Sequence, residues 1–279
     1  MSAQGSCADT AVGSAEAEGA RQRPLSAFAG GAVIGILGGL IGLGGAEFRL
    51  PLLIGPFRLR ALEAVILNKA MSLIVVATAL PFRASIVPFS AIAANWPTIL
   101  NLLAGSLIGA WCGASWATRV SSRNLYRVIA VLLVMIAMVL ATGHDTASSH
   151  VVLGAGWQVA VGVAAGVGIG VVGSLLGVAG GELLIPTLIL VFGADIKLAG
   201  SLSLAVSLPT MLVGFARYSR DGSFAVLARN KLFVVVMAAG SIVGTFVGGQ
   251  LLGIVPTQVL LPVLAAILII SAWKVWQHH

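Results

Sequence analysis

The residues of this chain that could do chemistry are charged side chains inside long apolar segments. Glu47 and Glu182 each follow a glycine-rich stretch, and Arg49 comes two residues after Glu47. A carboxylate in an apolar membrane segment is costly and is a functional candidate by default, and two of them could load and release protons. Alternatively, each carboxylate complements the dipole at the start of its own helix. We predict that Glu47 and Glu182 are a proton-coupling pair, with the dipole role as the alternative.

Two basic residues could supply the positive charge that an anion needs. Arg49 could pair with Glu47, extend its long side chain to an interface, or bind a substrate. Lys69 stands eight residues into an apolar segment and could also extend to an interface or bind an anion. Serines in such segments more often join helices than bind ligands. The polar strip on the two equivalent segments comprises Asn68, Lys69, Ser72, Ser201, Ser203 and Ser207.

The two glutamates are positioned by glycine-rich stretches that repeat each other. Residues 42–51 read GLGGAEFRLP and residues 177–186 read GVAGGELLIP, and they align without a gap at an offset of 135 residues. The same offset relates Gly105 to Gly240 and several other small residues further along. We therefore predict a tandem duplication of about five apolar segments per half, with close helix contacts at the spaced glycines.

Composition indicates a membrane protein built of helices. Hydrophobic residues make up 58% of the chain and charged residues 9%, whereas about a quarter of an ordinary soluble domain is charged. The apolar segments are continuous, and several are roughly 20 residues long, which predicts an all-α membrane bundle rather than a barrel. The net charge of +7 fits basic residues in cytoplasmic loops. We expect no nucleic-acid partner.

Basic residues also predict the topology. The apolar segments 47–57 and 182–193 follow the glycine breaks and are too short to cross a membrane as straight helices. If each break is a hairpin tip, twelve Lys and Arg residues lie on the side of the termini and only Arg83 and Lys197 on the other. If the chain crosses at each break, the split is eight to six. The positive-inside rule favours the hairpins, which make the halves inverted repeats with both termini cytoplasmic.

The predicted organisation follows from this topology. The protein would be a multi-pass protein of the inner (plasma) membrane, in contact with the lipid bilayer, and could form a homodimer. Its four parts would be a disordered cytoplasmic tail (1–24), a first membrane repeat (25–142), an extracytoplasmic linker (143–155) and a second membrane repeat (156–279).

Discontinuous helices in inverted repeats place a binding site where the two breaks meet. A helix that starts inside a protein directs unpaired N–H groups and the positive end of its dipole at that point, which suits an anion. Glycines allow positive φ and close approach of a ligand. We predict a small anion as the partner of these tips. The predicted substrate-binding residues are Gly42, Gly44, Gly45, Ala46, Arg49, Asn68, Lys69, Ser72, Gly177, Gly180, Gly181, Ser203 and Ser207.

At its glycine breaks the sequence resembles the sulfite exporter TauE/SafE family, also called the TSUP family of membrane permeases. The resemblance rests on GLGGA at 42–46 followed by Pro51, and on GVAGG at 177–181 followed by Pro186. Through the duplication it extends over nearly the whole chain. It implies secondary export or uptake of small sulfur-containing or organic anions, such as sulfite and sulfonates.

The chain departs from the common pattern of that family just after each break. A third glycine followed by an apolar residue is usual there, whereas this chain has Ala46, Glu47 and Glu182. We interpret the departure as the mark of a subgroup with its own coupling ion. The predicted function is proton-coupled export of sulfite, a sulfonate or a related organic anion. The alternative is an uptake permease or channel for another small anion or organic acid.

Two other classes of function are to be weighed, namely an ion channel or non-transporting scaffold, and an intramembrane enzyme. A Ser–Lys dyad that uses Lys69 is conceivable, but no motif supports it. The histidines lie in the predicted linker or at the C-terminus, where they cannot form a dyad or metal cluster inside the bundle; they are His144, His150, His278 and His279. We therefore expect no catalytic residue, no metal and no other cofactor.

Overall fold

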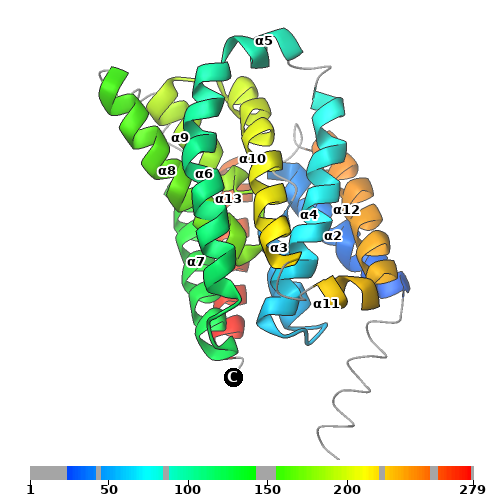
Figure 1. Ribbon diagram of the computed structural model, residues 1–279. Coiled ribbons are helices and arrows are strands. Elements are labelled where there is room, and N and C mark those ends of the chain that lie inside the picture. The colour runs from blue at the N-terminus through cyan, green and yellow to red at the C-terminus, as the bar shows by residue number, and fades with distance from the viewer. Residues whose placement is uncertain are drawn as a thin grey trace, which may run out of the picture.

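The computed structural model describes residues 24–41, 45–83, 88–142, 155–219, 224–251 and 257–277. Within these residues the protein consists of helices and contains no strand (Figure 1). The predicted all-α fold is confirmed. The predicted tail lies outside the described residues except for Pro24, and so does the predicted linker except for Ala155.

Helices follow in the same order and at the same spacing in the two halves. The first half contains α2 (Pro24–Ile41), α3 (Ala46–Ile54), α4 (Ala61–Arg83), α5 (Phe89–Ala94), α6 (Trp96–Ala117) and α7 (Ser122–Thr142). The second half contains α8 (Ala155–Leu176), α9 (Gly181–Phe192), α10 (Ile196–Ser219), α11 (Phe224–Arg229), α12 (Lys231–Leu251) and α13 (Thr257–Trp276). The offset of 135 residues places α5 on α11 residue for residue and matches the other pairs to within a few residues. The duplication seen in the sequence is therefore repeated in the helix boundaries.

Each half contains one short helix that the sequence did not predict. The apolar segment 90–117 divides at Asn95 into α5 and α6, and Asn230 separates α11 from α12 inside a stretch predicted as a loop. Both asparagines donate a side-chain hydrogen bond to a carbonyl four residues earlier, Asn95 to Ala91 at 2.9 Å and Asn230 to Val226 at 2.8 Å. Such local bonds compete with helix continuation, and this explains why both helices stop there.

Each glycine break is the turn of a helical hairpin. The Gln158 side-chain amide donates to the Val191 carbonyl at 2.8 Å, so the end of α9 lies beside the start of α8. In the first half, a Cβ on Gly30 of α2 would meet Leu52 of α3 at 3.0 Å. The helices α3 and α9 have only 9 and 12 residues. At about 1.5 Å per residue, neither can cross a hydrocarbon core.

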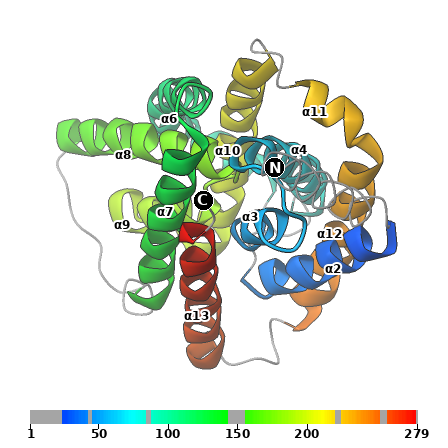
Figure 2. The ribbon, with the colours of Figure 1, turned by 90° about the horizontal axis from the view of Figure 1, so that it is seen from below.

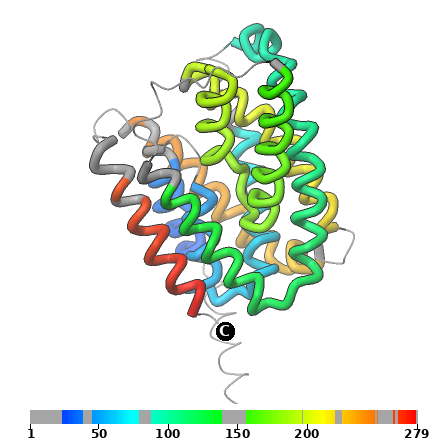
Figure 3. The backbone as a smooth tube through the Cα atoms, turned by 90° about the vertical axis from the view of Figure 1, so that its left-hand side faces the viewer, coloured from blue at the N-terminus to red at the C-terminus, as the bar shows by residue number. Residues whose placement is uncertain are grey.

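The two hairpins open toward opposite ends of the bundle. α4 begins beside α11, where Arg229 lies 3.9 Å from Glu63. α10 begins beside α5, since Ile92 and Leu198 pack on the same cluster. In Figure 1, α5 lies at the top and α11 near the bottom, and α4 and α10 run between them in opposite directions. α2 begins and α13 ends at the end that carries α11 (Figures 1 and 3).

Glycines bring helices of different halves into close contact. Seen from below, α2 lies beside α12, α6 beside α8 and α7 beside α13 (Figure 2). A Cβ on Gly109 of α6 would lie 2.1 Å from the Val167 carbonyl oxygen of α8. One on Gly244 of α12 would lie 2.1 Å from the Ala32 carbonyl oxygen of α2. Because only glycine permits this approach, the two equivalent interfaces depend on the repeated glycines.

Five of the described helices are long and apolar enough to cross a membrane, namely α4, α6, α8, α10 and α12. Shorter apolar stretches occur in α2, α9 and α13. Large apolar side chains such as Phe246 and Trp157 are exposed on the outside of the bundle. This is the surface expected of a helical bundle in lipid.

Candidate functional site

Both short helices begin at a glycine with left-handed backbone. Gly45 (φ 67°) precedes α3, Gly180 (φ 77°) precedes α9, and no side chain caps either helix. The N–H groups of the first turns therefore lack a side-chain partner, and each helix start carries a partial positive charge. Gly177 is also left-handed, with φ 68°. The predicted Gly42 and Gly44 lie outside the described residues.

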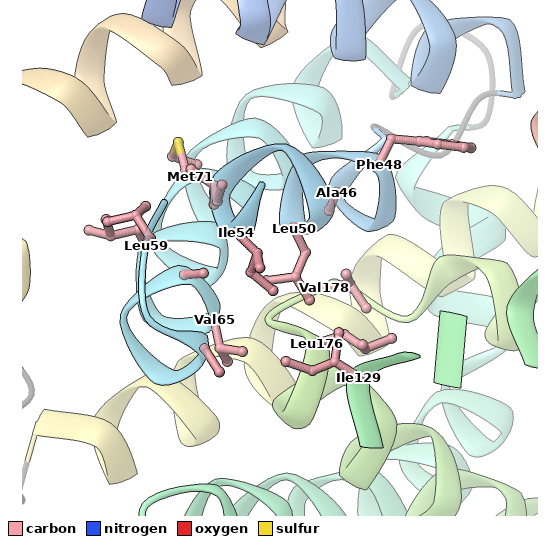
Figure 4. Close-up of a cluster of buried hydrophobic side chains, with 14 of the residues drawn as sticks. Ala46, Phe48, Leu50, Ile54, Leu59, Val65, Met71, Ile129, Leu176 and Val178 are labelled. Carbon is pink, nitrogen blue, oxygen red and sulfur yellow. The ribbon is translucent and has the colours of Figure 1, made fainter. Parts of the chain in front are cut away.

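The two hairpin tips meet at Asn68 of α4. Its side-chain amide donates to the Ala46 carbonyl at the start of α3, at 3.0 Å, and to the Leu176 carbonyl at the end of α8, at 2.9 Å. Figure 4 shows Ala46 of α3 and Val178 of the second tip in one hydrophobic cluster. The Asn68 oxygen accepts from Arg49. Asn68, predicted to bind substrate, thus uses both N–H groups to join the tips.

The carboxyl groups of Glu47 and Glu182 lie near each other inside the protein. Glu47 is fully buried and Glu182 is 3% exposed, and the two groups are close enough to interact electrostatically. Both oxygens of Glu47 and Oε2 of Glu182 lack a hydrogen-bond partner among the described residues. Since buried polar atoms are normally hydrogen-bonded, this pair needs an explanation, and a proton or a bound ligand would supply the missing partners.

Arg49 is fully buried in the same region but makes its hydrogen bonds elsewhere. Its guanidinium donates to Asn68 Oδ1 at 3.4 Å, to Ser72 Oγ at 3.2 Å and to Ser241 Oγ at 3.2 Å. Neither oxygen of Glu47 receives a hydrogen bond, although the two charges interact. Burial excludes the interpretation that Arg49 extends to an interface. The hydrogen-bonded pair with Glu47 is not formed.

Lys69 is buried as well, and it contacts a different part of the bundle. Its Nζ donates to the Gly173 carbonyl at 3.4 Å and to Ser174 Oγ at 3.2 Å. The ammonium lies 5.9 Å from the centre of the Tyr218 ring. Because Lys69 is only 1% exposed, it does not extend to an interface either. The two buried cations are therefore held separately, Arg49 by α4 and α12 and Lys69 by α8 and α10.

The predicted polar strip divides into two sets. Ser72 accepts a hydrogen bond from Arg49. Ser207 donates to the Ala179 carbonyl at 2.7 Å and holds the backbone just before the start of α9. Ser203 donates within its own helix, to a carbonyl three residues earlier at 2.9 Å. Of these serines, Ser72 and Ser207 are thus tied to the hairpin tips, whereas the bond of Ser203 is local.

Three residues around the two cations were not predicted, namely Ser174, Tyr218 and Ser241. A signal existed for Ser241, because the offset of 135 residues relates it to Ser106. Ser106 binds the Thr210 hydroxyl in the second half, with an O···O distance of 2.7 Å. Nothing in the sequence pattern pointed to Ser174 or Tyr218.

The site combines two uncapped helix starts, two neighbouring carboxyl groups and two buried cations. In the part of the chain that the structure describes, no three His, Cys, Asp or Glu residues gather as metal ligands would. The helix starts and the cations attract negative charge. The carboxyl groups can bind and release protons. The arrangement therefore suits reversible binding of an anion together with protons.

Comparison with known proteins supplies the family. Residues 6–140 match the family model described as sulfite exporter TauE/SafE. The first half of the chain is therefore similar to the TauE/SafE family. The match confirms the predicted resemblance over these residues, which include the glycine break at 42–51. It does not extend to the break at 177–186. No curated protein and no solved structure matches the chain. This similarity to a transporter family and the helices long and apolar enough to cross a membrane support a multi-pass membrane protein.

Proposed function

We propose that this protein belongs to the TauE/SafE family and is a secondary transporter whose small oxyanion substrate binds where the two hairpin tips meet. The observation that carries the proposal is the meeting of two uncapped helix starts beside three carboxyl oxygens, both of Glu47 and Oε2 of Glu182, that lack a hydrogen-bond partner among the described residues. Backbone N–H groups at Gly45, Ala46, Gly180 and Gly181 would hold the anion, and Arg49 adds positive charge.

We further propose that transport is coupled to protons through Glu47 and Glu182. As ionised carboxylates they would repel an arriving anion in a region of low dielectric constant. As neutral acids they would donate hydrogen bonds to its oxygens. Anion binding and proton binding then favour each other, so flux rises as the solution on the anion's side becomes more acidic.

The arrangement of the helices supports an alternating-access mechanism. We propose that the two halves are inverted repeats, with both termini in the cytoplasm and the linker 143–155 outside. Each hairpin then enters from one face of the inner membrane, and rocking of one half against the other opens the tips to each face in turn. A homodimer stays a prediction.

Sulfite or a sulfonate is the proposed substrate, and export the proposed direction. The name of the matching family model supports this choice, and a small tetrahedral or pyramidal oxyanion suits N–H donors that converge from two helices. Uptake of another small anion and a channel remain the alternatives. Saturable flux that responds to a proton gradient separates a carrier from a channel.

The test is counterflow of radiolabelled sulfite in proteoliposomes that contain the full chain, with methanesulfonate and acetate as competitors. We expect saturable counterflow that is faster at mildly acidic than at mildly basic pH. Glu47→Gln and Glu182→Gln should each remove this pH dependence. Glu63→Gln is the matched control, since Glu63 lies at the start of α4 beside Arg229, and it should keep the dependence. No counterflow of any of these anions would refute the anion carrier. An unchanged pH profile in both glutamine variants would refute the coupling.

A further inference from the structure

Lys69 is at the centre of a second polar cluster that is separate from the carboxyl pair. The cluster consists of Lys69, Ser174, Gly214 and Tyr218 and is called the Lys69 pocket below. Lys69, Ser174 and Tyr218 are each at most 1% exposed. They come from α4, α8 and α10, so the pocket joins elements of both halves.

The Lys69 pocket is shaped for an ammonium group. A Cβ on Gly214 would lie 2.6 Å from Lys69 Nζ and 2.9 Å from Ser174 Oγ, so a larger residue there would displace the ammonium from its present position. Ser174 Oγ donates its proton to the Ala110 carbonyl at 2.9 Å, and its lone pairs can then accept from Lys69. The Tyr218 hydroxyl donates to the Ser174 carbonyl at 2.9 Å and fixes the ring near the ammonium.

The residues of the Lys69 pocket are not repeated at the equivalent positions, so the packing that the two halves share does not depend on them. In the first half the positions equivalent to Ser174, Gly214 and Tyr218 are Gly39, Ala79 and Arg83, and in the second half Leu204 is equivalent to Lys69. An apolar side chain therefore serves at the equivalent place on α10. A charge inside a membrane protein is costly and is retained where it has a function.

The partners of Lys69 are all electrically neutral. They are a carbonyl oxygen, a hydroxyl and an aromatic ring. Among the described residues no carboxylate forms an ion pair with Lys69, and its two hydrogen bonds leave one of the three ammonium donors unused. A buried cation with neutral partners attracts an anion strongly in a region of low dielectric constant.

The pocket lies between the hairpin tips and one end of the bundle. Lys69 follows Asn68, which joins the tips, and a Cβ on Gly177 would lie 3.1 Å from the Lys69 backbone nitrogen. Tyr218 is in the last turn of α10, at the end of the bundle where α13 also ends (Figure 1). Lys69 therefore lies beside the tips, and its Tyr218 partner lies toward this end of the bundle.

We propose that Lys69 is a second anion-binding position, which receives the oxyanion between the hairpin tips and the end of the bundle where α2 begins and α13 ends. The inference rests on the proposed transport of an anion. It implies that the affinity for the anion differs between the two faces of the protein, which the pair of tips alone would not cause. A merely structural Lys69 would tie α4 to α8 and would affect both faces alike.

The experiment measures the KM for sulfite separately from each face, in proteoliposomes that contain the full chain in one known orientation. Lys69→Met should raise the KM at the face of the termini by about tenfold or more, because a hydrogen bond to a charged group is lost. The KM at the opposite face should change less than about twofold. Lys69→Arg, which keeps the charge, should lie between the wild type and Lys69→Met. Leu204→Met, at the equivalent position of α10, is the matched control and should match the wild type at both faces.

Equal changes of KM at the two faces, or no change, would overturn the proposal. If Lys69→Met does not fold, Gly214→Ala tests the same point, since its methyl group displaces the ammonium without removing the charge. That variant should raise the KM at the face of the termini, and an unaltered KM there would also overturn the proposal. Absence of sulfite flux in the wild type would contradict the proposed function itself, which distinguishes the two failures.

Discussion

At the scale of single residues, the site is an asymmetric version of a duplicated plan. Arg49 and Leu184 occupy equivalent positions, and so do Asn68 and Ser203. Arg49 donates to Asn68, which in turn donates to both hairpin tips. The first half has thus gained a connected polar network, while the second half keeps an apolar side chain at the position of Arg49. A transporter with such asymmetry can hold its two hairpins with different strength.

Asn68 is the residue where this asymmetry is easiest to measure. Asn68→Ala leaves the buried carbonyls of Ala46 and Leu176 without their donor, which we expect to cost about 1–3 kcal/mol for each group. Ser203→Ala removes only a bond within α10, so it should cost less than about 1 kcal/mol. The apparent Tm of the detergent-solubilised protein checks this. Equal losses of Tm in the two variants would contradict the role of Asn68 in joining the tips.

The two N-cap glycines offer a second comparison at this scale. An L-residue with left-handed backbone costs roughly 1–2 kcal/mol at either position. A Cβ on Gly45 would also lie 2.6 Å from the Ile34 carbonyl oxygen, whereas on Gly180 it would meet Ile169 Cγ2, a movable side chain, at 3.0 Å. Gly45→Ala should therefore lower the apparent Tm more than Gly180→Ala. A larger loss for Gly180→Ala would show that the backbone around Gly45 can move aside.

At the scale of elements, helix pairing depends on a few glycines. Gly109→Ala should separate α6 from α8, because its Cβ would lie 2.1 Å from the Val167 carbonyl oxygen. Gly168→Ala on α8 is the matched control, since nothing lies within 4 Å of a Cβ there. It should be neutral or stabilising by about 0.5–1 kcal/mol, as alanine favours the helix. Thermal unfolding in detergent distinguishes the two variants. An unchanged apparent Tm in Gly109→Ala would refute the close contact.

Most elements could be predicted from the sequence because their signals are long or repeated. Continuous apolar runs gave the long helices, and the aligned breaks at 42–51 and 177–186 gave the two short ones. The breaks at Asn95 and Asn230 were not predicted, since a single asparagine inside an apolar run is a weak signal. Here the local hydrogen bond of each asparagine outweighs the apolar pattern on both sides.

The candidate site was predictable in its residue types and less so in its contacts. Glu47 and Glu182 stood out because charged side chains are rare in apolar runs, and the structure brings them together. The partners of Arg49 and Lys69 could not be foreseen, because they come from α8, α10 and α12, far away in the chain. Such pairings depend on how helices rotate against each other, which the repeat pattern does not specify.

At the scale of the whole molecule, the direction of each hairpin decides the topology. The Gln158 backbone carbonyl near the start of α8 accepts from the Asn101 side-chain amide near the start of α6 at 3.5 Å, so α8 begins at the end of the bundle that carries α5. α13 ends at the opposite end (Figure 3). The start of α8 and the end of α13 therefore lie at opposite ends of the bundle.

Cysteine labelling in intact cells tests this topology. Cys7 and Cys112 are first replaced by serine, and a single cysteine is then placed at Ser148 or at Gln277. A membrane-impermeant maleimide should label Ser148→Cys before lysis and Gln277→Cys only after permeabilisation, because the twelve-to-two split of basic residues predicts that the termini lie inside. Labelling of both positions from the same face would require an even number of crossings between them. One hairpin would then have to cross the membrane, and the two tips could no longer meet as the bonds of Asn68 to Ala46 and Leu176 require.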